Sequence, residues 1–288
     1  MSIRTLTWNV LYRDRRERAA ILADYVTRIR PDVVMLQETS PADAAALAHS
    51  TGLRLAAVPD VLSDADTSVP ALLTSAAFRE PSIIELPHPQ QRHYYGVTAT
   101  VHHDGADVQA ASAHLRHTWQ AGRMGCDDDY RAAARGVTMP AQADTEFAES
   151  VNHRLDQLTS LLAALDETET GAEARLLAGD MNFVPDGPEY NTIVQAGWVD
   201  AWRAAPRLGS GATILDTNPL VLDNPRPYRD YVTSLMPGST SRLDYTLDFH
   251  FSRGSVSAGR AWVVGEPENA DTGAWPSDHL GIVVDYHL

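Results

Sequence analysis

The chain of 288 residues contains a single cysteine, Cys126, so no disulfide can form within it and no cysteine-based structural zinc site is available. It also lacks an apolar run of about 18 residues, which excludes a transmembrane helix. The first residues, Ile3–Trp8, are typical of a strand and not of a signal peptide. These absences favour a cytoplasmic protein without integral membrane association.

Positive charge is also scarce, because 23 basic residues face 38 acidic ones and give a net charge of −15. Proteins that bind long nucleic acids normally use a basic surface and release counterions. The arginine-rich stretch Arg13–Arg18 is interrupted by Asp14 and Glu17, and we expect it to coat the start of a helix. The charge disfavours a nucleic-acid partner without excluding one, since a local patch with a metal can bind phosphates. No obligate protein partner is evident.

Several catalytic signatures are missing from the sequence. There is no glycine-rich phosphate loop, no zinc-protease histidine motif and no Cys-x-x-Cys pair. No serine or cysteine stands in the recognisable context of a nucleophile.

Short apolar runs typical of strands alternate with amphipathic helices. One helix face extends over Ile21–Ile29 and is stopped by Pro31, a second over Val151–Leu165, and a shorter helix is expected at Pro188–Ala196. The pattern predicts an α/β fold in which two mixed β-sheets pack face to face with helices outside. No linker or repeat divides the chain, so we expect one domain over residues 1–288. The strand-like runs are Ile3–Val10, Val33–Leu36, Ala71–Thr74, Tyr94–Val101, Val108–Ala113, Arg175–Ala178, Leu243–Leu247, Ala261–Val264 and Gly281–Tyr286.

Six short polar signatures each follow or adjoin an apolar run. They supply carboxylates, amides and two imidazoles, which suit a hard divalent cation and an activated water that attacks phosphorus. The signatures are Thr7-Trp8-Asn9, Leu36-Gln37-Glu38, Ala113-His114-Leu115, Gly179-Asp180-Met181-Asn182, Leu243-Asp244-Tyr245 and Ser277-Asp278-His279.

Asn9, Glu38 and Asp278 are the candidate metal ligands, because side chains at strand ends can converge from distant parts of a chain. Glu38 is the strongest of them, since Mg²⁺ commonly takes one or two carboxylates together with waters and substrate phosphate. The alternative is a surface glutamate that precedes a helix beginning at Thr39-Ser40-Pro41.

Asp180 and Asn182 follow a buried run and, two apart on an extended segment, would point the same way. Asp180 could then orient or deprotonate a water, and Asn182 could donate to a phosphoryl oxygen. The alternative is an Asx-turn that closes the strand.

His279 and His114 are the candidate catalytic imidazoles. His279 could stabilise the pentacoordinate phosphorane or donate a proton to the leaving oxygen, and Asp244 could hold its ring in the right tautomer. His114 could bind a phosphate oxygen. The alternative for each histidine is an ordinary surface or core residue.

The six signatures, taken in order, resemble the endonuclease/exonuclease/phosphatase superfamily, which is DNase I-like, and the likeness extends over essentially the whole chain. The resemblance implies a four-layer α/β sandwich and phosphoester hydrolysis that depends on Mg²⁺ or Mn²⁺. It implies the roles given above for each signature residue, with Glu38 as the principal metal ligand and Asn9 and Asp278 nearby.

The substrate class stays open. The acidic charge favours a small phosphate ester, such as a nucleotide, a sugar phosphate or a lipid headgroup, over a DNA or RNA substrate of a nuclease. A non-catalytic binding module is a third reading, and it would predict a degraded signature. The insertion 116–150 contains Arg116, Arg123, Arg131 and Arg135, and it is interpreted either as a specificity lid or as a surface loop.

Overall fold

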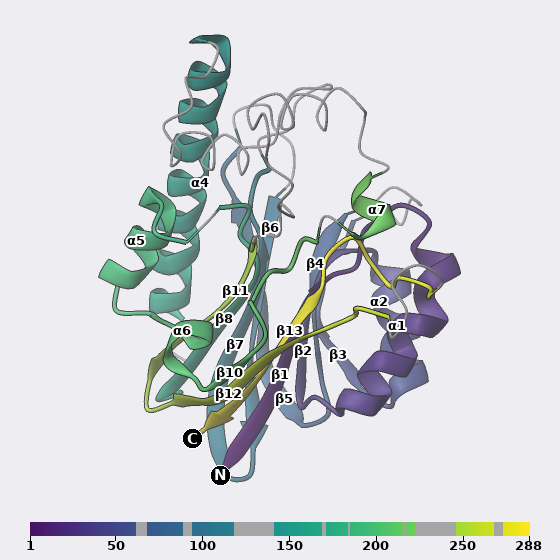
Figure 1. Cartoon of the computed structure of the whole chain (residues 1–288). Coiled ribbons are helices and arrows are strands. Elements are labelled where there is room, and N and C mark those ends of the chain that lie inside the picture. The colour runs from purple at the N-terminus through teal and green to yellow at the C-terminus, as the bar shows by residue number, and fades with distance from the viewer. Residues whose placement is uncertain are drawn as a thin grey trace.

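A computed structural model describes residues 1–61, 68–88, 94–117, 141–168, 171–183, 185–215, 217–222, 246–267 and 273–288, with backbone only for residues 141–148. The strands form two mixed sheets that pack face to face, and helices cover the outer surface of each sheet (Figure 1). This arrangement confirms the predicted four-layer α/β sandwich.

The first sheet has a parallel pair at its centre, and its other strands pair antiparallel except for a short parallel contact at one edge. In spatial order its seven strands are β10 (Arg207–Leu208), β12 (Ser257–Val264), β13 (Gly281–His287), β1 (Ser2–Asn9), β2 (Val33–Thr39), β4 (Val69–Thr74) and β3 (Arg54–Ala57).

The second sheet is antiparallel apart from one central parallel pair. In spatial order its six strands are β5 (Ala77–Leu86), β6 (Tyr94–His103), β7 (Ala106–His114), β8 (Ala174–Asp180), β11 (Asp248–Gly254) and β9 (Val199–Asp200). The parallel pair is β7 with β8.

Helices α1 (Arg15–Ile29) and α2 (Pro41–Thr51) pack on the outer face of the first sheet, and α4 (Ala141–Glu167) and α5 (Pro188–Gln195) pack on the second. Two short helices complete the described elements: α6 (Ala201–Ala204) and α7 (Pro219–Leu222). Among the described residues no helix is both long and apolar enough to cross a membrane.

Strand β2 illustrates why the central strands appear as continuous apolar runs. Val33 and Met35 contribute to the core between the sheets, whereas Val34 and Leu36 pack in the core beneath α1 and α2. Because alternate side chains point to opposite faces and both faces are covered, every position of the run is apolar.

Two of the differences from the sequence-based expectation concern β11 and β5. The strand expected at Leu243–Leu247 is wrong in its described part, because β11 begins only at Asp248 and positions 243–245 lie outside the described residues. Strand β5 was not predicted, because most of its side chains are exposed and leave no apolar run to recognise.

Candidate active site

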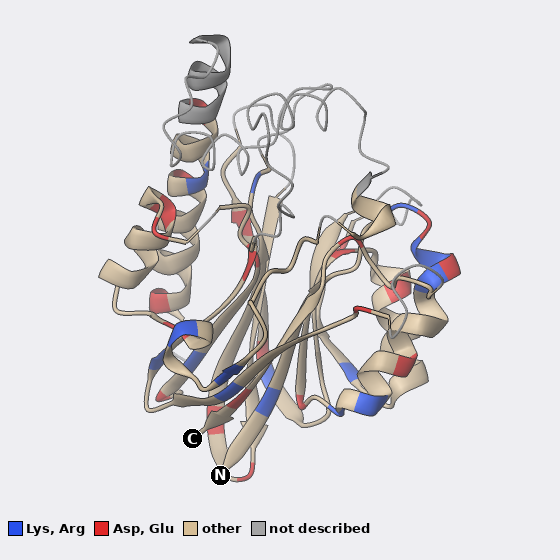
Figure 2. Cartoon of the chain, in the orientation of Figure 1, with Lys and Arg blue, Asp and Glu red and all other residues tan. Residues whose placement is uncertain are grey.

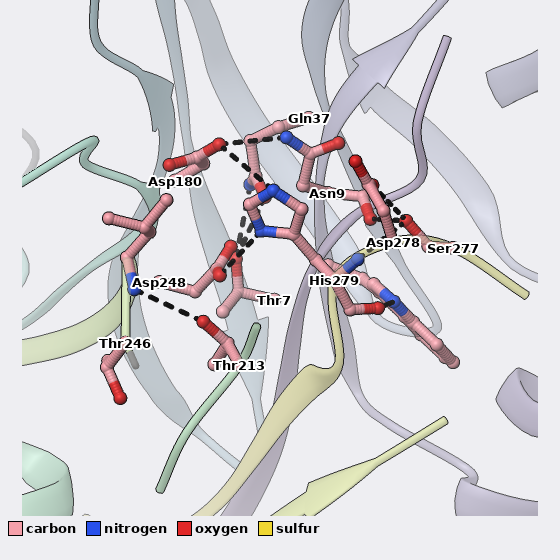
Figure 3. A network of polar contacts seen from close by, with 12 residues as sticks. Thr7, Asn9, Gln37, Asp180, Thr213, Thr246, Asp248, Ser277, Asp278 and His279 are labelled. Atoms are coloured by element: carbon pink, nitrogen blue, oxygen red, sulfur yellow. Dashed lines mark hydrogen bonds and ion pairs between the residues drawn. The ribbon is translucent and has the colours of Figure 1, made fainter. Parts of the chain in front are cut away.

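The polar signatures meet at one edge of the two sheets. Strands β1, β7 and β8 end there, and β11 and β13 begin there. Parallel neighbours end at the same edge and antiparallel neighbours begin at it, so this topology gathers residues from distant parts of the chain. Figure 3 shows the resulting network of side chains.

Glu38 lies where the pairing of β2 with β4 shifts register, and its backbone has a left-handed φ of 56°. Such an irregularity re-aims a side chain. The carboxylate accepts the Tyr12 N–H at 3.0 Å and Asn9 Nδ2 at 3.1 Å. Burial opposes ionisation, but His114, the Tyr12 N–H and Asn9 outweigh it and lower the pKa of Glu38. Although α2 does begin just beyond it, the Glu38 carboxylate belongs to the polar network.

Asp180, the last residue of β8, is paired in register with His114 of β7 and with Asp248 of β11. The residue before it must be glycine, because Gly179 has φ 150° and a Cβ there would lie 1.9 Å from the Ala113 carbonyl oxygen. Close approach of β7 and β8 therefore brings their two terminal side chains together.

The Asp180 Oδ2 atom lies at the centre of the cluster. It accepts Asn9 Nδ2 at 2.8 Å and lies 3.5 Å from His114 Nε2 and 3.9 Å from His279 Nε2. Burial raises the pKa of Asp180 to about 6, against the opposing attraction of His279 and His114.

Asn182 turns away from the extended path that was expected. Its φ is 50°, its backbone N–H donates to Asp180 Oδ1 at 3.1 Å, and its Nδ2 donates to the Leu115 carbonyl at 3.0 Å. The expectation that the Asp180 and Asn182 side chains point the same way is wrong, because the Asx-turn closes the strand between them. A contact of Asn182 with phosphate stays a prediction.

His279 Nδ1 contacts Asp248 Oδ2 at 2.8 Å, and both side chains are buried (Figure 3). Burial alone would lower the pKa of His279, but Asp248 and Asp180 outweigh it and raise this pKa well above its usual value. Nε2 of the ring lies 3.9 Å from Asp180 Oδ2.

The sequence analysis assigned the role of holding the His279 ring to Asp244, which lies outside the described residues. In the described part of the chain, Asp248 makes the contact with Nδ1. Two Leu-Asp-aromatic triplets stand four residues apart, at 243–245 and at 247–249. The second leads directly into the alternating run Asp248–Ser252, and that continuation was the available signal.

Asn9 connects the two sheets at this edge. Its Oδ1 accepts the Leu11 N–H at 3.0 Å, while its Nδ2 faces the carboxylates of Glu38 and Asp180. The Asn9 side chain therefore donates hydrogen bonds to the carboxylates of Glu38 and Asp180. Its role as a metal ligand stays a prediction.

Asp278 lies beside this group. Ser277 Oγ donates to the Asn9 carbonyl at 2.6 Å and lies 3.2 Å from Asp278 Oδ1. Burial raises the pKa of Asp278, His279 opposes this, and repulsion from Glu38 raises it further. A cation bound between Glu38 and Asp278 would relieve the repulsion between their carboxylates.

Arg18 supports the site in a way that the sequence analysis missed. Arg15 and Arg18 are buried, so the expectation that the arginine-rich stretch coats a helix is wrong for both. The Arg18 guanidinium donates to four main-chain oxygens, which belong to Val10, Leu11, Arg13 and Pro276. It therefore ties the segment after β1 to the segment that leads into Ser277-Asp278-His279.

The donor set fits a hard divalent cation. Within the described residues, Glu38, His114 and Asp180 each offer a ligand atom, and these atoms lie within 4.8 Å of one another. Asp180, Asp248 and His279 form a second such group. Carboxylate-rich clusters of this kind are typical of Mg²⁺ or Mn²⁺ sites.

A family model described as the endonuclease/exonuclease/phosphatase family matches residues 6–279. The chain belongs to this family. Members of the endonuclease/exonuclease/phosphatase family are metal-dependent phosphoester hydrolases, and the matched range includes every candidate site residue named above. No curated protein sequence matches the chain.

Solved structures share the fold over the whole chain. TDP2 of D. rerio, complexed with a single-strand DNA product, is 20% identical with a TM-score of 0.65, covering 100% of this chain and 99% of its own. The mannosyl-6-phosphatase of Bacteroides thetaiotaomicron is 14% identical with a TM-score of 0.70, covering 99% and 100%. A family member from Leptotrichia buccalis is 18% identical with a TM-score of 0.64, covering 99% and 100%.

The insertion 116–150 is described only at its two ends. Arg116 is buried: its backbone N–H donates to Gln157 Oε1 at 2.8 Å and its guanidinium contacts His153 Nδ1. Arg123, Arg131 and Arg135 lie outside the described residues. A lid in this insertion stays a prediction.

Proposed function

We propose that the protein is a divalent-metal-dependent hydrolase of small phosphate esters, with Mg²⁺ or Mn²⁺ as its cofactor. The observation that carries the proposal is the convergence of Glu38, Asp180 and His114, whose ligand atoms lie within 4.8 Å of one another, with the Asp248–His279 pair beside them. Membership of the family supports phosphoester hydrolysis, and the donor set supports the metal.

In this proposal some residues hold the cation and others transfer protons. Glu38 would hold the cation, with Asp278 and His114 at hand, and the cation would supply charge stabilisation at a phosphoryl oxygen. The Asp180 carboxylate would orient the attacking water and accept its proton. The His279 imidazolium, held through Nδ1 by Asp248, would donate its Nε2 proton to the leaving oxygen.

The charge distribution supports a small ester over a polynucleotide. All 23 basic residues are arginines, since the sequence contains no lysine. The described arginines are spread over both sheets and several helices instead of forming one basic stripe (Figure 2). The mannosyl-6-phosphatase neighbour is consistent with a small ester, whereas the TDP2 neighbour keeps polynucleotide hydrolysis as the second candidate.

Hydrolysis of a substrate panel tests the proposal. The panel contains mononucleotides, sugar and inositol phosphates, sphingomyelin, and single- and double-stranded DNA and RNA, each with Mg²⁺, Mn²⁺ or EDTA. We expect metal-dependent cleavage of a small ester that Glu38→Ala and His279→Ala abolish. His102→Ala, at an exposed histidine far from the cluster in the fold, is the matched control. Cleavage of polynucleotide alone, falling steeply with salt, would establish the second candidate instead.

A further inference from the structure

A pocket of about 280 Å³ opens beside the candidate metal ligand. Glu38 and His114 line one part of it, and three tyrosines, Tyr12, Tyr94 and Tyr95, line much of the rest. The phosphate of a bound ester would therefore lie near Glu38 and His114, and its organic group would lie near the tyrosines.

The aromatic part of this pocket is built from both sheets. Tyr12 comes from the segment after β1, whereas Tyr94 and Tyr95 open β6 in the second sheet. The Tyr12 backbone N–H donates to Glu38 Oε2 at 3.0 Å, so this residue is anchored directly to the candidate metal ligand.

The rings of Tyr94 and Tyr95 are held in place by the fold before any ligand binds. Tyr94 stacks on His88 with ring centroids 5.0 Å apart and an interplanar angle of 19°. Tyr95 is buried, which raises the pKa of its phenol and keeps it neutral. Rings that are already oriented lose little conformational entropy on binding.

We propose, building on the proposed function, that Tyr12 and Tyr94 select phosphate esters whose organic group carries a ring. A nucleobase and a hexose share this chemistry, since each presents a ring face that can pack on a tyrosine side chain. Stacking on an aromatic side chain contributes about 1–3 kcal/mol per base, which corresponds to roughly a 5- to 150-fold preference.

The test compares kcat/KM for three phosphate esters, each offered as a monoester and as a methyl diester. They carry a nucleoside, a hexose, or glycerol, which has no ring. The variants are Tyr12→Leu and Tyr94→Leu, which remove the ring, and Tyr12→Phe, which keeps it. Saturation-transfer NMR of free nucleoside and free hexose measures stacking independently of catalysis.

The nucleoside or hexose ester should exceed the glycerol ester at least about 5-fold in kcat/KM, and Tyr12→Leu and Tyr94→Leu should reduce that ratio while Tyr12→Phe preserves it. The ester with the higher kcat/KM shows whether the natural substrate carries a nucleoside or a hexose. Metal-dependent hydrolysis with equal rates for ring and glycerol esters would overturn the inference and leave the proposed function intact. If no ester is hydrolysed, the proposed function fails, and the ring site is then judged by NMR alone. A saturation-transfer signal that Tyr12→Leu removes would support the site, and the absence of a signal would overturn it.

Discussion

Asp248 and His279 lie in contact at 2.8 Å, and this contact joins the start of β11 in one sheet to the residue just before β13 in the other. The carboxylate fixes which imidazole nitrogen faces Asp180 and raises the pKa of the ring. The orientation of this imidazole therefore depends on the packing of the two sheets against each other.

Asp248→Asn should lower kcat by about 10²- to 10⁴-fold, because it removes the charge that keeps the imidazole protonated and oriented. Steady-state kinetics on the substrate found by the panel measures the loss. Asp244→Asn is the matched control, since Asp244 stands in the other Leu-Asp-aromatic triplet. Loss of activity in Asp244→Asn with normal activity in Asp248→Asn would contradict the assignment.

Arg18→Lys should destabilise the protein by about 2 kcal/mol or more and weaken Mg²⁺ binding. The Arg18 guanidinium donates to four main-chain carbonyl oxygens, and a lysine ammonium cannot reach all of them. Each buried carbonyl that loses its hydrogen bond costs about 1–3 kcal/mol. Urea unfolding and calorimetric titration with Mg²⁺ measure the two effects. Arg16→Lys, at an exposed neighbouring arginine, should change neither. An Arg18→Lys protein with unaltered stability and metal affinity would rule out the positioning role.

The pKa of Asp180, raised to about 6 from an ordinary 3.8, predicts a pH-dependent stability in EDTA. The folded state holds this proton more tightly than the unfolded state, so the stabilisation is fully present below about pH 3.8 and is lost as the pH rises through about 6. The unfolding free energy of the wild type relative to Asp180→Asn should therefore fall by up to about 3 kcal/mol over that range.

Urea unfolding of both proteins across this pH range in EDTA provides the measurement. Asp107→Asn is a control of opposite sign, because a hydrogen bond from Arg79 lowers the pKa of Asp107 and its contribution grows as the pH rises. A constant difference between wild type and Asp180→Asn would show that the carboxyl titrates normally.

Local patterns in the sequence were enough to predict much of the fold and part of the site. The apolar runs predicted β1, β2, β7, β8 and β13, because strands covered on both faces carry few polar positions. Pro31 marked the end of α1, since proline cannot continue a helix. Glu38, His114, Asp180 and His279 were identified because each signature adjoins such a run.

Other features depended on distance in space. The contact between Asp248 and His279 could not be identified from two equivalent triplets, because it forms only when β11 packs against the other sheet. From the sequence alone, Arg18 is expected to be a surface charge. In the fold it is surrounded by the segments that contain Val10 and Pro276. The sequence by itself determined which residue types lie at the strand ends. The tertiary structure decided which of them meet, because contacts between atoms of different strands depend on register, bulges and sheet packing that no local pattern encodes.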